Sequence, residues 1–94
     1  MHLNLENRKR VINMFKVGTV THYYDKIGVA IVELSATLSV GEKVKFVRGG
    51  EDLFTEVVES IQIEHKKLDS AGKGDVVGLK TQEVVKAGTE VFKL

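Results

Sequence analysis

Few side chains of this 94-residue sequence have the types and spacing that catalysis or metal binding requires. The three histidines are His2, His22 and His65, and no two of them stand three or four residues apart, as two ligands on one helix face would. The sequence has no cysteine, which excludes a disulfide, a thiolate zinc site, an iron–sulfur cluster and a cysteine nucleophile. We therefore expect no metal and no cofactor.

The remaining candidate catalytic groups also lack a supporting pattern. None of the serines has the sequence of a nucleophile elbow around it. Four carboxylates are candidates for a catalytic pair, but a solvated sheet face explains them better: Glu56, Glu59, Glu64 and Asp69. The sequence therefore predicts that the chain is not an enzyme. The alternative is a small enzyme whose site is a cleft near His22, Tyr23 and Asp25.

A nucleotide site is not expected either. A phosphate-binding loop requires Gly-x-x-x-x-Gly-Lys-Ser/Thr, and the sequence has a single Gly-Lys pair, Gly72-Lys73. Lys67 stands where the first glycine belongs, and Gly74 stands where Ser or Thr is needed. This segment also precedes a predicted strand, so the helix N-terminus that binds a pyrophosphate is missing. The chain alone is expected to bind no nucleotide.

The overall composition excludes several classes of protein. Fourteen basic residues against thirteen acidic ones give a net charge of +1, which argues against a dedicated polybasic DNA or membrane binder. A hydrophobic fraction of 43% is too high for a disordered chain. The longest apolar run, residues 29–32, is far shorter than the roughly 20 residues of a membrane span. With no signal-peptide pattern in the sequence, we expect a cytoplasmic protein without membrane contact.

Basic residues nevertheless gather locally, first in an N-terminal arm. Arg8, Lys9 and Arg10 are opposed by only Glu6 among the first ten residues, so we divide the chain into a basic arm, residues 1–13, and one β-domain, residues 14–94. Two tyrosines offer a stacking surface of the kind that binders of single-stranded RNA use. The candidate RNA contacts are Arg8, Lys9, Arg10, Lys16, Tyr23, Tyr24, Lys43, Lys45, Arg48, Lys66 and Lys67. The alternative for the basic strand residues is the solvated face of an alternating strand.

The elements that must position these residues are predicted to be strands. Residues 15–24 are rich in β-branched and aromatic side chains, and residues 28–34 are a nearly continuous apolar run, typical of a well-buried strand. Residues 43–47 alternate in polarity, and Gly49-Gly50 in residues 48–52 indicates a hairpin. Residues 76–81 and 89–94 are two further short strands joined by residues 82–88.

Residues 53–64 form the longest predicted strand, with a bend or bulge because neither alternating set of its residues is purely apolar. Residues 65–75 are polar and glycine-containing and are predicted to be a loop. About six short strands without a helical period indicate an all-β fold. Because the sequence has no proline to guard sheet edges, a closed barrel of six or seven strands is the expected architecture.

Several residues are assigned to backbone geometry rather than to chemistry. Gly28, Gly41 and Gly88 are expected in turns, as is the pair Gly74-Asp75. Gly78 lies inside a predicted strand, where a glycine weakens packing unless the sheet bends or another backbone passes close to it.

The order of these pieces resembles a known domain. Residues 26–34 are followed by the Leu-x-x-Gly-Glu-x-Val pattern of residues 38–44, by residues 57–61, by the Ala-x-x-Gly-Asp-x-Val-Gly-Leu pattern of residues 71–79, and by residues 85–91. This order is similar to the β-barrel second domain of translational GTPases such as elongation factor Tu and the bacterial initiation factors. Residues 16–30 more closely resemble the barrel appended to the C-terminus of collagenase-like peptidases.

The resemblance implies a barrel of the translation-factor second-domain type and two candidate functions. The first is a non-catalytic binding module that contacts tRNA, ribosomal RNA or another translation component. The alternative is a protein-interaction module that docks in trans onto a larger enzyme, as the appended barrels do within one chain. The expected partner is therefore an RNA or a larger protein.

Overall fold

A computed structural model describes residues 15–94 of the chain, and within that range it contains strands and turns but no helix. The arm residues Arg8, Lys9 and Arg10 lie outside the described residues. The strands are β1 Phe15–Tyr24, β2 Val29–Leu34, β3 Leu38–Ser39, β4 Lys43–Arg48, β5 Glu51–Val57, β6 Ile61–Ile63, β7 Lys66–Leu68, β8 Ser70–Ala71, β9 Val76–Lys80 and β10 Glu90–Lys93. The predicted all-β fold is confirmed.

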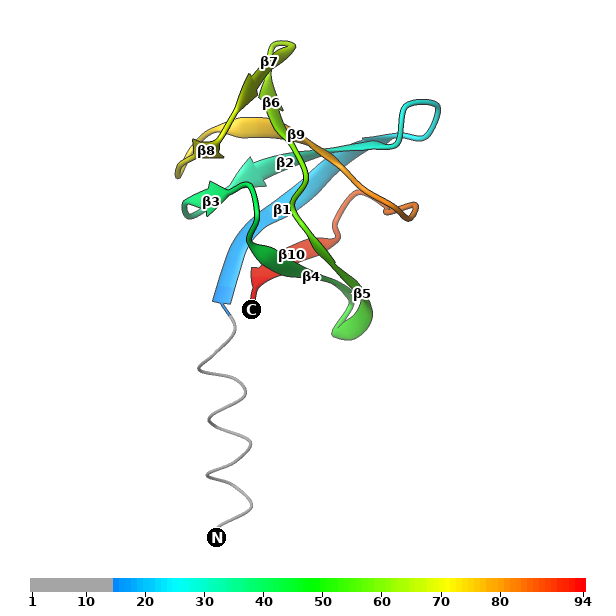
Figure 1. Ribbon diagram of the computed structural model, residues 1–94. Helices are drawn as coiled ribbons and strands as arrows, with labels where there is room; N and C mark the ends of the chain where they lie inside the picture. The colour runs from blue at the N-terminus through cyan, green and yellow to red at the C-terminus, as the bar shows by residue number, and fades with distance from the viewer. Residues whose placement is uncertain (1–14) are drawn as a thin grey trace, which may run out of the picture.

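Eight of these strands form one antiparallel sheet in the order β5-β4-β10-β1-β2-β9-β6-β7, and β3 pairs with β8 in a small second sheet. Figure 1 shows that the large sheet is strongly curled, with β4 and β5 near one end of the molecule and β6 and β7 at the other. The long strands β1 and β2 run between these ends. The concave side of the curl holds the core.

The expected closed barrel is not observed in residues 15–94, because no hydrogen-bonded ladder joins the edge strands β5 and β7. Instead, residues 58–60 carry the chain from β5 at one edge to β6 beside the other edge (Figure 1). Val58 donates its N–H to the Glu42 carbonyl at 2.8 Å, and Gly41 donates to the Val58 carbonyl at 2.9 Å. The crossing segment is thus held by the turn before β4, so the curled sheet is bridged without a closing ladder.

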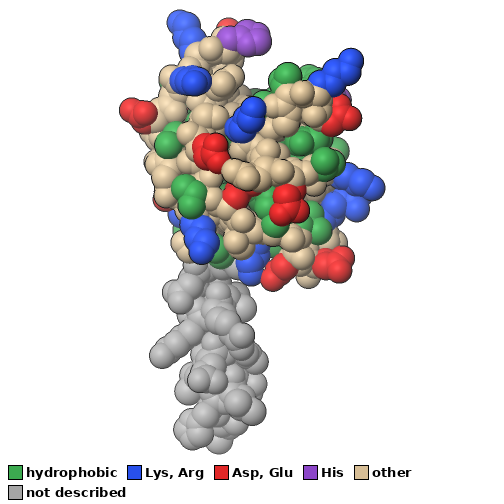
Figure 2. Space-filling view, turned by 45° about the vertical axis from the view of Figure 1, so that its right-hand side comes forward, with side chains coloured by type: hydrophobic (Ala, Val, Ile, Leu, Met, Phe, Trp, Pro, Cys, Tyr) green, Lys and Arg blue, Asp and Glu red, His purple; other side chains and the backbone are tan. Residues whose placement is uncertain are grey.

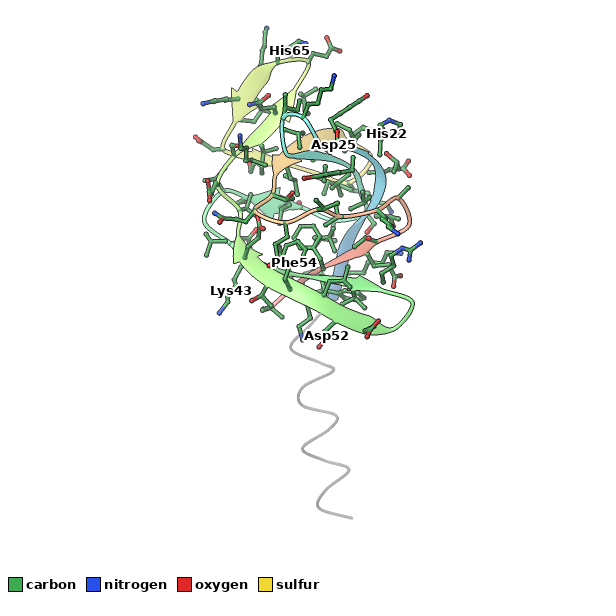
Figure 3. The ribbon with its side chains drawn as sticks, turned by 90° about the vertical axis from the view of Figure 1, so that its right-hand side faces the viewer. His22, Asp25, Lys43, Asp52, Phe54 and His65 are labelled. Atoms are coloured by element: carbon green, nitrogen blue, oxygen red, sulfur yellow. The ribbon has the colours of Figure 1, made fainter. Side chains whose placement is uncertain are left out.

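The core follows the alternation of the strands, because successive side chains point to opposite faces of a sheet. Ala30, Val32 and Leu34 of β2 point inward and are buried, whereas Val29, Ile31 and Glu33 point outward. Phe54 of β5 lies toward the inside of the molecule (Figure 3). Its ring stacks on that of Phe46, with centroids 4.6 Å apart. The core also contains Val17, Val20, Leu38, Val44, Val58, Ile61, Val77, Leu79, Val85 and Val91.

Two register shifts in β1 decide which of its side chains reach the core. The first lies between Lys16 and Gly18 in the pairing with β10, and the second between Val20 and His22 in the pairing with β2. A bulge adds a residue to one strand and reverses the facing of the residues after it. Tyr23 consequently packs against the core, while Tyr24 is exposed.

Two predicted elements differ from those observed. The single strand expected over residues 53–64 is divided into β5 and β6 by the crossing segment. The chain therefore leaves the strand completely where only a bend or bulge was expected. The loop expected over residues 65–75 is wrong, because it contains β7 and β8. The β6–β7 turn consists of Glu64 and His65 with φ values of 49° and 68°, so it is a tight turn built without the glycine or asparagine that normally marks one.

Candidate functional site

An apolar hollow on the convex side of the sheet is one candidate binding site in residues 15–94. Its floor is a row of residues that pair across three strands, Ile31 of β2, Gly78 of β9 and Gln62 of β6. The outward side chains Val29 and Ile31 of β2 and Val76 of β9 are on the same face. Its volume is about 270 Å³.

Gly78 lies at the centre of this floor. A Cβ at this position would lie 3.1 Å from Val29 Cγ1 and 3.8 Å from Ile31 Cδ1, both of which lean over the glycine. Its φ is not in the left-handed region, so conformational freedom is not the reason that a glycine fits here. The glycine instead lets its neighbours approach the sheet. The nearest approach to Gly78 is therefore made by these side chains, with the Gln62 backbone carbonyl oxygen farther away at 3.9 Å.

The walls of the hollow come from two turns. Tyr24 and Ile27, at the β1–β2 turn, form one side, and the Tyr24 ring lies 4.9 Å from the ring of His22. Glu64 and His65, at the tip of the β6–β7 hairpin, form the polar end. We call the set Tyr24, Ile27, Val29, Ile31, Val76 and Gly78 the outer hollow.

The outer hollow suits binding through apolar contact. Ile27 and Val76 are 58% and 51% exposed, although water-exposed aliphatic surface is unfavourable. A strand that is apolar on both faces, like β2, is typical of sheets that are covered on both sides. Val29 and Ile31 on the outer face of β2 are half-buried, and Glu33 on the same face is exposed. This apolar depression is therefore a candidate contact site for another molecule.

A second hollow is polar and mixed in charge. It has a volume of about 320 Å³ and is lined by Lys16, Thr19, Glu33, Leu34, Ser35, Lys73 and Gly74. The Lys16 ammonium is paired with Glu90 at 3.1 Å, which neutralises one of the two cations. Lysines and hydroxyls on an open surface do not by themselves define a ligand, so this depression defines no partner.

The candidate RNA contacts in the described residues do not come together. Lys43, Lys45 and Arg48 lie on β4, whereas Lys66 and Lys67 lie on β7 at the other edge of the sheet. In Figure 3, Lys43 and Asp52 lie toward the end opposite His65, which marks the tip beside Lys66. Figure 2 shows basic and acidic side chains interspersed on one face rather than a uniformly basic surface.

Ion pairs further reduce the free positive charge. The Lys45 ammonium lies 3.0 Å from Asp52 Oδ2, and Lys16 is held by Glu90. The two tyrosines do not form one stacking platform either, because Tyr23 faces the core and Tyr24 faces the outer hollow. Of the predicted candidates that fall within residues 15–94, only Tyr24 lines the outer hollow.

The turn residues are all placed in turns by the backbone. Gly28, Gly41, Gly74 and Gly88 have φ values of 66°, 95°, 91° and 93°, in the region that favours glycine. Asp75 accepts a hydrogen bond from the backbone N–H of Gly72 at 2.9 Å, which closes the turn before β9.

An acidic cluster joins β5 to the long connection before β10. The backbone N–H of Gln82 donates to Glu56 Oε1 at 3.0 Å, and Gln82 Nε2 donates to Glu59 Oε2 at 2.8 Å. Partial burial raises the pKa of Glu56, and the nearby Glu59 and Glu83 carboxylates raise it further, against the lowering effect of the Gln82 hydrogen bond. These contacts help hold the edge of the sheet to residues 81–89, which is a structural task.

Other kinds of site have little support in this structure. In residues 15–94 no three His, Asp or Glu side chains are grouped so as to hold a metal ion. No hydrogen bond in the described part links His22 to Asp25. No helix in that part has the length and apolar character needed to cross a bilayer.

Sequence reasoning missed Ile27, Val29, Ile31 and Val76 as site residues. The signal was present in residues 28–34, where both alternating sets are apolar. Such a pattern is typical of a strand buried in the core, whereas half of this one faces outward (Val29 and Ile31).

The fold and the outer hollow together define a small all-β domain with a surface suited to binding. No family model matches the chain. Over 90 residues, 96% of this chain, it is 32% identical to an uncharacterized protease of Methanocaldococcus jannaschii, and it spans 22% of that relative's length.

Among solved structures, the chain is similar to the C-terminal domain of a Geobacillus thermoleovorans protein described as a U32 peptidase. The TM-score is 0.78 at 26% identity, over 84% of this chain and 91% of that one. The selenomethionine variant of the same domain gives a TM-score of 0.76 at 25% identity, over 82% and 96% of the two chains. The resemblance to the domain appended to collagenase-like peptidases is thereby supported, and the likeness to translation factors stays a prediction.

Proposed function

We propose that this chain is a non-catalytic accessory module that docks onto a larger protein of the U32-peptidase type. The observation that carries the proposal is the similarity of nearly the whole described domain to the C-terminal domain of such a protein. The function is binding, and any proteolytic chemistry resides in the partner.

The size relation to the M. jannaschii relative supports this proposal. The chain corresponds to 22% of that protein, so most of the relative lies outside the matching region. A domain that works beside a larger neighbour needs a surface for it. The outer hollow provides an exposed apolar surface on rigid strands, which is the form that a protein interface requires.

The alternative of an RNA-binding module has less support. Its candidate residues in the described part are spread over β1, β4 and β7, and Lys16 and Lys45 are engaged in ion pairs. Affinity for a nucleic acid depends on neutralising several phosphates with one surface. The contribution of Arg8, Lys9 and Arg10 stays a prediction.

The test is a binding measurement between this chain and the M. jannaschii relative from which the matching region has been removed. We expect micromolar binding by isothermal titration calorimetry, and much weaker binding to the full-length relative, whose own domain occupies the same contact surface. The control is the relative's own matching region added back as a separate chain. Rebinding of that region without any binding of this chain contradicts the proposal.

A further inference from the structure

We propose that the outer hollow is the docking site itself, and that its occupant is an apolar side chain presented by the surface of the larger protein partner. This inference rests on the proposed function and names the part of the domain that performs it. It commits to a protein anchor, aliphatic or aromatic, rather than to a free small molecule.

The dimensions of the hollow favour a side chain. Its volume of about 270 Å³ is just below the range of pockets that enclose a whole small ligand, which measure roughly 300–1,000 Å³. Interfaces between proteins, in contrast, obtain much of their affinity from a few apolar anchors seated in small depressions. The outer hollow has the size and lining of such a depression.

The floor is preformed, which lowers the cost of binding. Ile31, Gly78 and Gln62 are fixed by the ladders that join β2, β9 and β6. Tyr24 is backed by the His22 ring at 4.9 Å, so one wall also has a neighbour that limits its motion. Because Gly78 has no Cβ, Val29 and Ile31 pack closely over the centre of the floor.

The charges around the hollow are mixed, which argues for an uncharged anchor. Glu64 lies at one end, and Lys67 pairs with Gln62 in the ladder on the same face. Glu33 pairs with Val76, and Lys80 pairs with Val29. With two acidic and two basic side chains around it, the site has no dominant sign, so recognition depends on apolar contact. Binding should therefore change little with salt.

The partner in this inference is supplied by the comparison with the longer relative. The chain matches 22% of that protein, so the matching domain there has a large covalently attached neighbour. A neighbour that covers the outer face of β2 would explain why Val29 and Ile31 on that face are apolar. In this chain the same face meets the partner in trans.

A matched pair of substitutions tests the inference. Val76→Lys places a charge in the outer hollow, and Val84→Lys makes the same change on the connection before β10, outside the hollow. Both valines are exposed, at 51% and 69%, so neither change should prevent folding. Circular dichroism and thermal unfolding check this, and Ile27→Lys, in the β1–β2 turn, gives a second independent change.

The measurement is the titration against the relative without its matching region, repeated from 50 to 500 mM salt. We expect Val76→Lys and Ile27→Lys to weaken binding at least about tenfold, Val84→Lys to leave it within about twofold, and wild-type affinity to vary less than about threefold with salt. If all three variants bind the partner as tightly as the wild-type chain does, the outer hollow is not the docking site, but the proposed function still holds. Absence of wild-type binding while the relative's own region rebinds overturns the function itself. If the wild-type chain associates with itself and Val76→Lys abolishes this while its affinity for the partner is unchanged, the outer hollow binds a second copy of the chain. This result also overturns the inference.

Discussion

Gly18 is the residue of this fold at which the smallest addition should have the largest effect. A Cβ there would lie 2.6 Å from Val32 Cγ1 and 2.9 Å from the Glu33 carbonyl oxygen, so backbone as well as side chain would have to move. We expect Gly18→Ala to lower the free energy of unfolding by about 1–3 kcal/mol, measured by urea denaturation.

Gly72 provides the matched control for this prediction. The nearest atom to a Cβ at Gly72 is Thr37 Oγ1 at 3.9 Å, and its φ is not left-handed. Gly72→Ala should leave stability unchanged or raise it by about 0.5 kcal/mol, because alanine restricts the unfolded chain. Equal losses in the two variants would show that packing around Gly18 is not the cause.

Thr89 tests the cost of an unpaired polar atom. Its side chain is fully buried, and Oγ1 has no hydrogen-bond partner in the described part of the chain. Thr89→Val keeps the branched shape and removes the hydroxyl, so we expect an increase of about 1 kcal/mol in the free energy of unfolding. A clear loss of stability in urea titrations would indicate that the hydroxyl is hydrogen-bonded in solution.

Glu56 gives a prediction about pH. Burial raises its pKa in the folded state, so folding disfavours the ionised form. Its contribution to stability is therefore greatest at acidic pH, and it is lost as the pH rises through the raised pKa. Glu56→Gln removes the ionised form while its amide oxygen can still accept the Gln82 N–H. We expect a small gain in melting temperature at pH 7 that vanishes near pH 3. A gain of the same size at both pH values would contradict this reasoning.

Among the elements, two tight turns with the same backbone and different sequences allow a direct comparison. The β6–β7 turn has Glu64 and His65 at positive φ, and the β4–β5 turn has Gly49 and Gly50 at φ values of 61° and 81°. Non-glycine residues in this region are strained. Glu64→Asn combined with His65→Gly should raise the free energy of unfolding by about 1 kcal/mol, measured by thermal denaturation.

The reciprocal change is the control for the turn prediction. Gly49→Glu combined with Gly50→His installs the strained pair at the β4–β5 turn and should lower stability by a similar amount. If the β6–β7 change is neutral while the β4–β5 change is costly, contacts of Glu64 or His65 compensate for their backbone strain.

The sequence is most informative where local pattern and local structure coincide. Alternation over residues 43–47 and the glycine pair after it indicate β4 and its turn, and both are observed. Residues 65–75 mislead, because Glu64-His65 turns without the usual residue types. The outward facing of Val29 and Ile31 is hidden for another reason, because an apolar side chain does not reveal from the sequence whether it faces the core or the outer side of the sheet.

At the scale of the whole molecule, the two edges of the sheet are bridged by other segments, so the curled sheet resembles a barrel. Residues 58–60 cross between those edges, and Gln82 links the β5 side to the connection before β10 through Glu56 and Glu59. The chain thus gains most of the enclosure of a barrel while β5 and β7 stay unpaired with each other. The same curl exposes the outer hollow on its convex side and separates the basic residues of β4 from those of β7.

That separation leads to an expectation for RNA, measured by fluorescence anisotropy of labelled tRNA over a salt series. Each phosphate that a surface neutralises adds close to one unit to the slope of log affinity against log salt. Because Lys43 and Arg48 lie far in the sheet order from Lys66 and Lys67, one strand of RNA should engage only one group at a time. We expect weak binding with a slope of about 3 or less, changed by no more than about twofold in Lys43→Gln/Arg48→Gln and in Lys66→Gln/Lys67→Gln. Tight binding with a steep slope that both double variants reduce would require the two ends of the sheet to act as one surface, and would favour an RNA partner over the peptidase-type protein.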